Sequence, residues 1–153
     1  ALGGGMPLGA FISSNEIMSS LASDPPLGHI TTFGGHPVCC AAGLASMQIL
    51  TGEGLVRKCI PKSELFRELL SHNIIREVRG EGLFLAVSLP DPRYIGYVVG
   101  KAPDYGLILD YFLFCGDAFR IAPPLIISEE EIRLAAEQLM KLLDDAEKNV
   151  KLK

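Results

Sequence analysis

The strongest constraint on the fold lies near the C-terminus, where the sequence has the pattern of a long amphipathic helix. Ser128 and Glu131 have the spacing of a capping box, in which each side chain accepts a hydrogen bond from the other residue's backbone. Behind them, apolar residues recur at helical spacing and form one stripe: Ile132, Ala135, Ala136, Leu139, Leu142 and Leu143. A helix with one apolar face requires a second layer to cover that face.

Short strand patterns earlier in the chain predict this second layer. The segments with strand character are residues 74–79, 83–89, 107–109 and 119–121. Gly80-Glu81-Gly82 joins the first two segments, which should therefore form a hairpin with a three-residue loop. We expect residues 55–153 to form a small α+β unit, in which the last helix covers an antiparallel sheet of three or four strands.

The first part of the chain is less regular. Residues 9–13 are a short strand candidate, and Asn15 is placed to cap a brief helix that ends near Leu21. Pro37 suits the first position of a helix, and residues 38–50 behind it are apolar on every side. A helix without a polar face is expected to be buried.

A further helix is expected over residues 55–71, where leucines recur at helical spacing. Pro61 lies inside this segment. Because proline lacks the backbone N–H and its ring crowds the preceding turn, Pro61 should break or kink the helix.

Composition excludes several classes of protein. Hydrophobic residues make up 48% of the 153 residues, which is enough for a packed core. Lys and Arg total 14 against 18 acidic residues, without a basic run, so we expect no nucleic-acid partner. No segment is long and apolar enough for a bilayer, and no secretory signal is evident, so we expect no membrane partner. The four cysteines do not suggest a disulfide framework in a chain this long and this apolar, which favours a reducing, cytoplasmic location.

The glycine run near the start has two interpretations. Gly3-Gly4-Gly5 could form a loop that approaches a cofactor closely, or it could be a flexible end. Known phosphate loops do not fit, because Ala10 and Phe11 stand where a P-loop requires Lys and Ser or Thr. The dinucleotide pattern fails as well, since Leu8 occupies the position of its third glycine.

Two hydroxyls precede a glycine pair and a helix start in Thr31-Thr32-Phe33-Gly34-Gly35-His36-Pro37. Hydroxyls and free N–H groups at a helix N-terminus suit an anion, although an ordinary helix cap has the same composition. His36, Cys39 and Cys40 have metal-ligand spacing, but no second ligand cluster accompanies them. We therefore expect no metal site and interpret His36 as a capping or packing residue.

Arg120 lies in a strand whose alternation places Phe119 and Ile121 on the other face. A guanidinium held by a strand is suited to bind a carboxylate through two parallel hydrogen bonds. The alternative is an exposed arginine without a ligand, which is the commoner situation.

Four motifs together resemble the class III aminotransferases, the group that includes acetylornithine and ornithine aminotransferases. They are Ala1-Leu2-Gly3-Gly4-Gly5-Met6-Pro7-Leu8-Gly9, Thr31 to Pro37, Val78-Arg79-Gly80-Glu81-Gly82-Leu83 and Arg120-Ile121-Ala122-Pro123-Pro124-Leu125. The resemblance covers essentially the whole chain. It departs from the family at His36, where Asn is usual, and at Pro61, where relatives tend to keep an unbroken helix.

This resemblance implies an α/β fold-type I transferase that uses pyridoxal 5'-phosphate and works as a homodimer with sites at the subunit interface. Residues 1–54 would be the end of the large cofactor-binding domain, including a linking helix. Residues 55–153 would be the small C-terminal α+β domain with its antiparallel sheet. The Schiff-base lysine of the family stands immediately before the Ala-Leu-Gly-Gly-Gly run, so the chain itself would contain no catalytic residue and would be inactive alone.

The resemblance also implies roles for three residues. Thr32 would contact the cofactor phosphate of the neighbouring subunit, Thr31 would lie next to the substrate, and Arg120 would bind the substrate α-carboxylate. The parent enzyme would move an amino group between an amino acid or ω-amino donor and a 2-oxo acid. A class III mutase or decarboxylase, or a non-catalytic piece that only folds or associates, remains an alternative.

Overall fold

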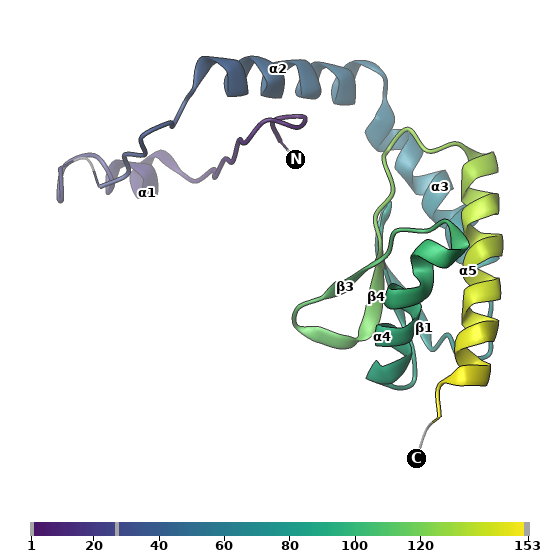
Figure 1. Ribbon diagram of the computed structural model, residues 1–153. Helices are drawn as coiled ribbons and strands as arrows, with labels where there is room; N and C mark the ends of the chain where they lie inside the picture. The colour runs from purple at the N-terminus through teal and green to yellow at the C-terminus, as the bar shows by residue number, and fades with distance from the viewer. Residues whose placement is uncertain (1, 27, 152–153) are drawn as a thin grey trace. The chain divides into compact units, whose positions relative to one another are not determined.

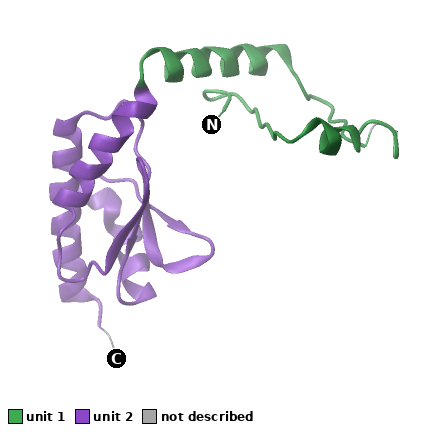
Figure 2. Ribbon diagram, turned by 180° about the vertical axis from the view of Figure 1, so that it is seen from behind, with its two compact units in different colours: residues 1–54 green, residues 55–153 purple. Residues whose placement is uncertain are grey.

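The computed structural model describes residues 2–26 and 28–151. The chain divides into two compact units, residues 1–54 and 55–153, which are coloured separately in Figure 2. Each unit is described by itself below.

The first unit contains two helices, α1 (Asn15–Ser19) and α2 (Pro37–Gly52). The side chain that caps α1 belongs to Ser14, whose Oγ accepts a hydrogen bond from the N–H of Ile17 at 3.3 Å. The prediction that Asn15 caps this helix is therefore wrong by one residue, and the helix ends before Leu21. Residues 9–13 do not form a strand, because no other extended segment within residues 2–26 and 28–151 pairs with them.

The glycine run forms a tight turn rather than a flexible end. The N–H of Met6 donates to the carbonyl of Gly3 at 3.0 Å, and Gly4 and Gly5 have φ values of 55° and 107°. A Cβ on Gly3 would collide with the Met6 carbonyl, and one on Gly4 would lie 3.3 Å from Ser46 Cβ of α2. Glycine is thus required both by the left-handed backbone and by the close approach to the helix.

The prediction that α2 is buried is wrong for the described chain. Only Cys39 and Gly43 of this helix are buried, whereas several of its large apolar side chains are exposed: Val38, Leu44, Met47 and Ile49. Cys40 is also exposed. The small glycine turn covers one side of α2. The apolar side chains on the other sides of the helix have no covering layer within residues 2–26 and 28–54.

The second unit is built on a four-stranded antiparallel sheet, as expected from the sequence (Figure 1). Its strands are β1 (Glu77–Glu81), β2 (Phe84–Ser88), β3 (Asp110–Phe112) and β4 (Cys115–Ile121), in the order β1-β2-β4-β3. The first hairpin has a two-residue turn at Gly82 and Leu83 rather than the predicted three-residue loop, and Gly82 has a φ of 52°. Residues 107–109 precede β3 and form no strand: Leu107 and Leu109 pack against the core, whereas Ile108 is exposed.

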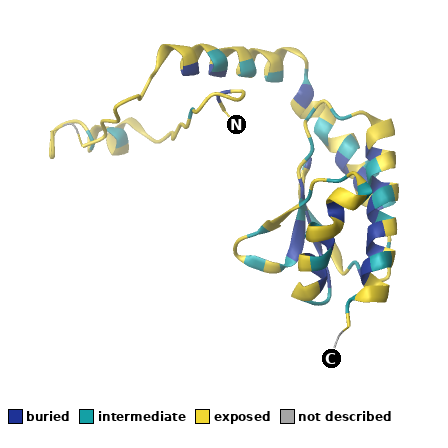
Figure 3. Ribbon diagram, viewed as in Figure 1, coloured by how far each residue is buried: buried dark blue, intermediate teal, exposed yellow. Residues whose placement is uncertain are grey.

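Helices α3 (Leu55–Leu69), α4 (Pro92–Lys101) and α5 (Glu129–Asn149) and the 3-10 turn η1 (Ala102–Tyr105) complete this unit. One face of the sheet supplies Leu85, Val87 and Phe119 to the core, and all three are fully buried. Buried stretches of the second unit are dark blue in Figure 3. The apolar stripe of α5 packs against them, which confirms the predicted covering of the sheet by the last helix. The capping box of α5 is present, with the N–H of Ser128 donating to Glu131 at 2.7 Å and the N–H of Glu131 to Ser128 Oγ at 3.2 Å.

Helix α3 runs through Pro61 without a break, so of the two predicted effects, a break or a kink, the break does not occur. Pro61 is exposed, whereas Leu55, Ser63 and Phe66 of the same helix are buried. A proline inside a helix costs about 3 kcal/mol, and burial of one or two large side chains is of similar size. The amphipathic face therefore holds the helix together across this residue.

No single helix in the described ranges has the length and apolar character needed to cross a membrane. Helices α2 and α3 meet the criteria of length and composition only when they are counted together as a bent pair.

Candidate active-site segments

The threonine segment lies directly before α2, where residues 32–35 form turns. The N–H of Gly34 donates to the carbonyl of Thr31 at 3.3 Å, and Gly35 has a φ of 71°, which favours glycine. His36 Nδ1 accepts a hydrogen bond from the N–H of Val38 at 3.3 Å and thus caps α2. The interpretation of His36 as a capping residue is confirmed.

The two threonine hydroxyls have different surroundings. Thr31 Oγ1 lies against Gly34, close enough that a Cβ on Gly34 would collide with it. Thr32 is exposed, and its hydroxyl has no hydrogen-bond partner within residues 2–26 and 28–151. The first turn of α2 has no acidic residue that would repel an anion. An exposed hydroxyl in the turn that leads into a 16-residue helix is of the kind that can donate a hydrogen bond to a phosphate group.

Arg120 lies on β4, on the sheet face opposite the buried Phe119, as the alternation predicts. Its guanidinium forms an ion pair with Asp110, its direct cross-strand neighbour on β3. The Arg120 Cζ also lies 5.8 Å from the centre of the Phe84 ring. The guanidinium is therefore held in place and already bonded to one carboxylate, so a substrate carboxylate would have to compete with Asp110.

Thr31 and Thr32 belong to the first unit and Arg120 to the second. Their joint contact with one bound molecule stays a prediction from the resemblance.

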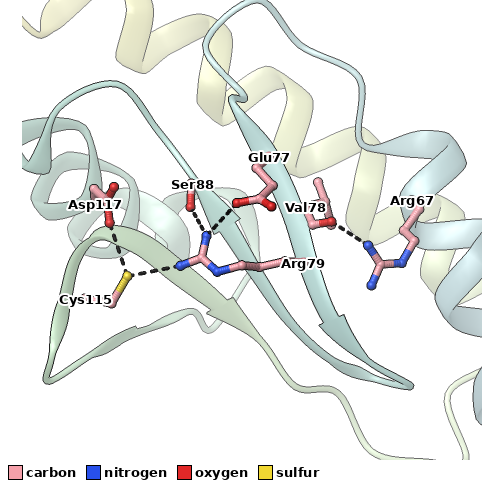
Figure 4. Close-up of polar contacts among 7 residues, drawn as sticks. All are labelled: Arg67, Glu77, Val78, Arg79, Ser88, Cys115 and Asp117. Carbon is pink, nitrogen blue, oxygen red and sulfur yellow. Dashed lines mark hydrogen bonds and ion pairs between the residues drawn. The ribbon is translucent and has the colours of Figure 1, made fainter.

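A second arginine on the same face of the sheet was not identified as a site residue from the sequence. Arg79 Nη1 donates to Ser88 Oγ and, at 3.1 Å, to Glu77 Oε2, and Nη2 donates to Cys115 Sγ at 3.2 Å (Figure 4). The thiol of Cys115 donates in turn to Asp117 Oδ1 at 3.1 Å. The only signal in the sequence was the Val-Arg-Gly-Glu-Gly motif, whose spacing does not reveal contacts with residues on β2 and β4.

These contacts have electrostatic consequences. Partial burial lowers the pKa of Arg79, but the nearby Cys115 and Glu77 outweigh this effect and raise it. The hydrogen bond from Cys115 lowers the pKa of Asp117, with smaller help from Arg79. Arg79 therefore stays fully charged, and Asp117 stays ionised at neutral pH.

His72, Asp144 and Glu147 bring three metal-ligand atoms close together, although the sequence showed no partner for His72. His72 Nδ1 accepts a hydrogen bond from the N–H of Ile74 at 3.2 Å, so in neutral imidazole the proton is on Nε2, which faces Asp144 at 3.1 Å. A metal on Nε2 would require the proton to move to Nδ1, where it would face the N–H of Ile74. This cluster therefore links α5 to the loop before β1 and does not suit a cation.

Comparison with known proteins agrees with these motifs. The family model described as Aminotransferase class-III matches residues 1–143. The acetylornithine aminotransferase of Mycobacterium leprae is 40% identical over 147 residues, which is 94% of this chain and 35% of that protein. The ornithine aminotransferase of Brevibacillus brevis is 34% identical over 151 residues, again 94% of this chain and 35% of that protein. The chain thus spans about a third of the length of these relatives.

Solved structures give the same result at the level of fold. The omega transaminase from Pseudomonas jessenii in complex with PMP superimposes with a TM-score of 0.74 at 30% identity, over 86% of this chain and 32% of that one. A thermostable omega transaminase variant, engineered for asymmetric synthesis of enantiopure bulky amines, gives a TM-score of 0.75 at 31% identity over the same shares of the two chains. The predicted fold-type I transaminase fragment is confirmed. The chain belongs to the class III aminotransferase family.

Proposed function

We propose that this chain is the C-terminal part of an aminotransferase that moves an amino group between an amino acid or ω-amino donor and a 2-oxo acid. The observation that carries the proposal is the family match over residues 1–143, together with an arginine that the sheet holds in carboxylate-binding geometry. Pyridoxal 5'-phosphate, when bound, supplies the electron sink for the amino-group transfer.

In this proposal the chain contributes binding and orientation. The exposed Thr32 hydroxyl would donate a hydrogen bond to the cofactor phosphate, assisted by the positive end of α2. Arg120 would bind the substrate α-carboxylate and fix the orientation of the reacting carbon, with Thr31 beside it. The individual roles rest on the resemblance, and the exposed hydroxyl of Thr32 supports the first of them.

The remaining parts of the proposal concern the whole enzyme. It would be a homodimer in the cytoplasm, with residues 1–54 in the large domain and 55–153 in the small domain. The lysine that attaches the cofactor would stand immediately before Ala1. Consequently, the chain alone should show no transaminase activity, and added pyridoxal 5'-phosphate should give no shifted visible absorbance beyond that caused by surface lysines.

A chimera tests the proposal directly. Residues 1–153 would replace the matching segment of the Mycobacterium leprae acetylornithine aminotransferase, and transamination would be followed by the formation of the 2-oxo and amino products. We expect an active enzyme. Arg120→Lys should raise KM for α-carboxylate donors by about tenfold or more, since one bidentate charged contact is lost.

Thr32→Ala in the same chimera should weaken cofactor binding, whereas Thr32→Ser, which keeps the hydroxyl, should restore it. Thr51→Ala, at an exposed hydroxyl near the other end of α2, serves as the matched control. A folded, cofactor-loaded chimera without transaminase activity would contradict the proposal, and release of carbon dioxide or an isomerised amino acid would favour a decarboxylase or a mutase.

A further inference from the structure

The sheet face opposite the core carries a small pocket that has no role in the function proposed above. Direct cross-strand pairing places Arg79, Ala86, Arg120 and Asp110 in one row on this face. The pocket has a volume of about 270 Å³ and lies at one end of the row. Its lining consists of Arg79, Gly80, Phe84, Ala86, Phe112 and Cys115.

Arg79 is held rigidly at this pocket and keeps hydrogen-bonding capacity. Its Nη1 is engaged by Ser88 and Glu77, and its Nη2 by Cys115. The Nε–H has no hydrogen-bond partner in residues 2–26 and 28–151. Because three contacts fix the plane of the guanidinium, little side-chain entropy is left to lose when a further acceptor binds.

The other walls of the pocket are apolar. Phe84 and Phe112 meet edge to face, with ring centres 6.1 Å apart and an angle of 84° between their planes. Phe84 is 54% exposed, although large aromatic side chains are usually buried. Ala86 also lines the pocket and adds a small apolar side chain. A cation beside two aromatic rings suits a ligand with one acidic end and one apolar end.

We propose that this pocket binds a small organic carboxylate that carries an apolar group. The carboxylate contacts Arg79, and the apolar group packs against Phe84 and Phe112. A ligand carboxylate would have to compete with Glu77 for Arg79, as a substrate carboxylate would compete with Asp110 for Arg120. Arg120 does not line this pocket, although its Cζ lies 5.8 Å from the centre of the Phe84 ring on the same sheet face.

Cys115 gives a direct reporter, because its side chain lines the pocket. The native chain would be alkylated with iodoacetate or iodoacetamide; both reagents form a bond between sulfur and carbon and release iodide, but only iodoacetate carries a carboxylate. At each cysteine, the rate with iodoacetate is divided by the rate with iodoacetamide. We expect this ratio to be about two- to fivefold higher at Cys115 than at the exposed Cys40, because one exposed ion pair changes a rate by about this factor.

Two variants and two competing carboxylates complete the test, with each cysteine assigned by mass spectrometry. Arg79→Gln should lower the ratio at Cys115 to that of Cys40, whereas Arg133→Gln, which removes an exposed charge from α5, should leave it unchanged. Benzoate should slow the reaction of iodoacetamide at Cys115 more than acetate does, without an effect at Cys40. If Arg79→Gln fails to fold, the alkylation ratios and the benzoate protection measured on the unaltered chain still test the proposal.

Either of two results overturns the proposal. The first is an equal ratio at Cys115 and Cys40 in the unaltered chain. The second is a lack of protection of Cys115 by benzoate. Neither result bears on the transaminase proposal, because the experiment needs no cofactor and leaves Thr32 and Arg120 unchanged.

Discussion

Individual residues of this chain are constrained most where the backbone leaves no room for a side chain. Gly80 in β1 has a φ of 131°, and a Cβ there would collide with the carbonyl oxygen of Phe84. Gly80→Ala should therefore lower the free energy of unfolding by about 2 kcal/mol or more, measured by urea denaturation. Gly96→Ala, at an exposed position of α4 with nothing within 4 Å, should raise it by up to about 1 kcal/mol. The same change in the free energy of unfolding for both variants would contradict this distinction.

At the same scale, Asp110 should control the affinity of Arg120 for carboxylates. The Asp110 carboxylate forms an ion pair with the Arg120 guanidinium, and both side chains are partly exposed. In the active chimera, Asp110→Asn should lower KM for α-carboxylate donors by about two- to fivefold, because the substrate no longer displaces a charged partner. Steady-state kinetics with an amine that lacks a carboxylate provides the control, since its KM should not change. A KM that rises for both substrates would indicate that Asp110 only holds β3 to β4.

Among the helices, the start of α4 depends on one carboxylate. Asp91 accepts hydrogen bonds from the side chain of Arg93 and from its N–H, and these lower the pKa of Asp91 to about 2. Because the folded pKa lies below the usual unfolded value of about 3.9, this contribution to stability is present above pH 4. It is lost as the pH falls through 2. Asp91→Asn should flatten the stability profile between about pH 4 and 2, measured by denaturation at each pH.

The edge of the sheet is protected by a side chain from α3. Arg67 donates to the carbonyls of Val78 at 2.5 Å and Gly80 at 2.8 Å, and β1 is an edge strand. Free carbonyls on an edge strand can pair with another chain. Arg67→Ala should therefore increase self-association, measured by sedimentation velocity over a range of concentrations. Arg57→Ala removes an exposed arginine from the same helix and should leave the distribution unchanged.

Sequence patterns predicted some helices and strands of this chain correctly and missed the bounds of others, and the difference has a physical cause. The capping box and stripe of α5 were evident because both depend on neighbours within the same helix. The start of β3 and the continuity of α3 at Pro61 were not evident from the sequence, because they depend on strand pairing and on packing against distant residues. The same applies to the site: Arg120 could be assigned to a strand face, but its pairing with Asp110 and the Arg79–Cys115 contact arise from cross-strand register.

Over the whole molecule, packing is concentrated in residues 55–153. The residues of the hydrophobic core all lie in the sequence from Phe66 to Ala146. Within residues 2–26 and 28–54, by contrast, the buried residues are Gly3, Cys39 and Gly43. We expect hydrogen exchange of the isolated chain to show strong protection in β2 and β4 and weak protection in α2. Equal protection of α2 and the central strands would contradict this difference in local stability.

The strand order also affects the synthesis of the protein on the ribosome. Strand β2 pairs with β4 rather than with β3, and residues 89–114 are made between them. One side of β2 therefore stays without hydrogen-bond partners until residues 115–121 leave the exit tunnel. During that interval Leu85 and Val87 lack their cross-strand neighbours Ile121 and Phe119, and the free edge of β2 can pair with a wrong strand.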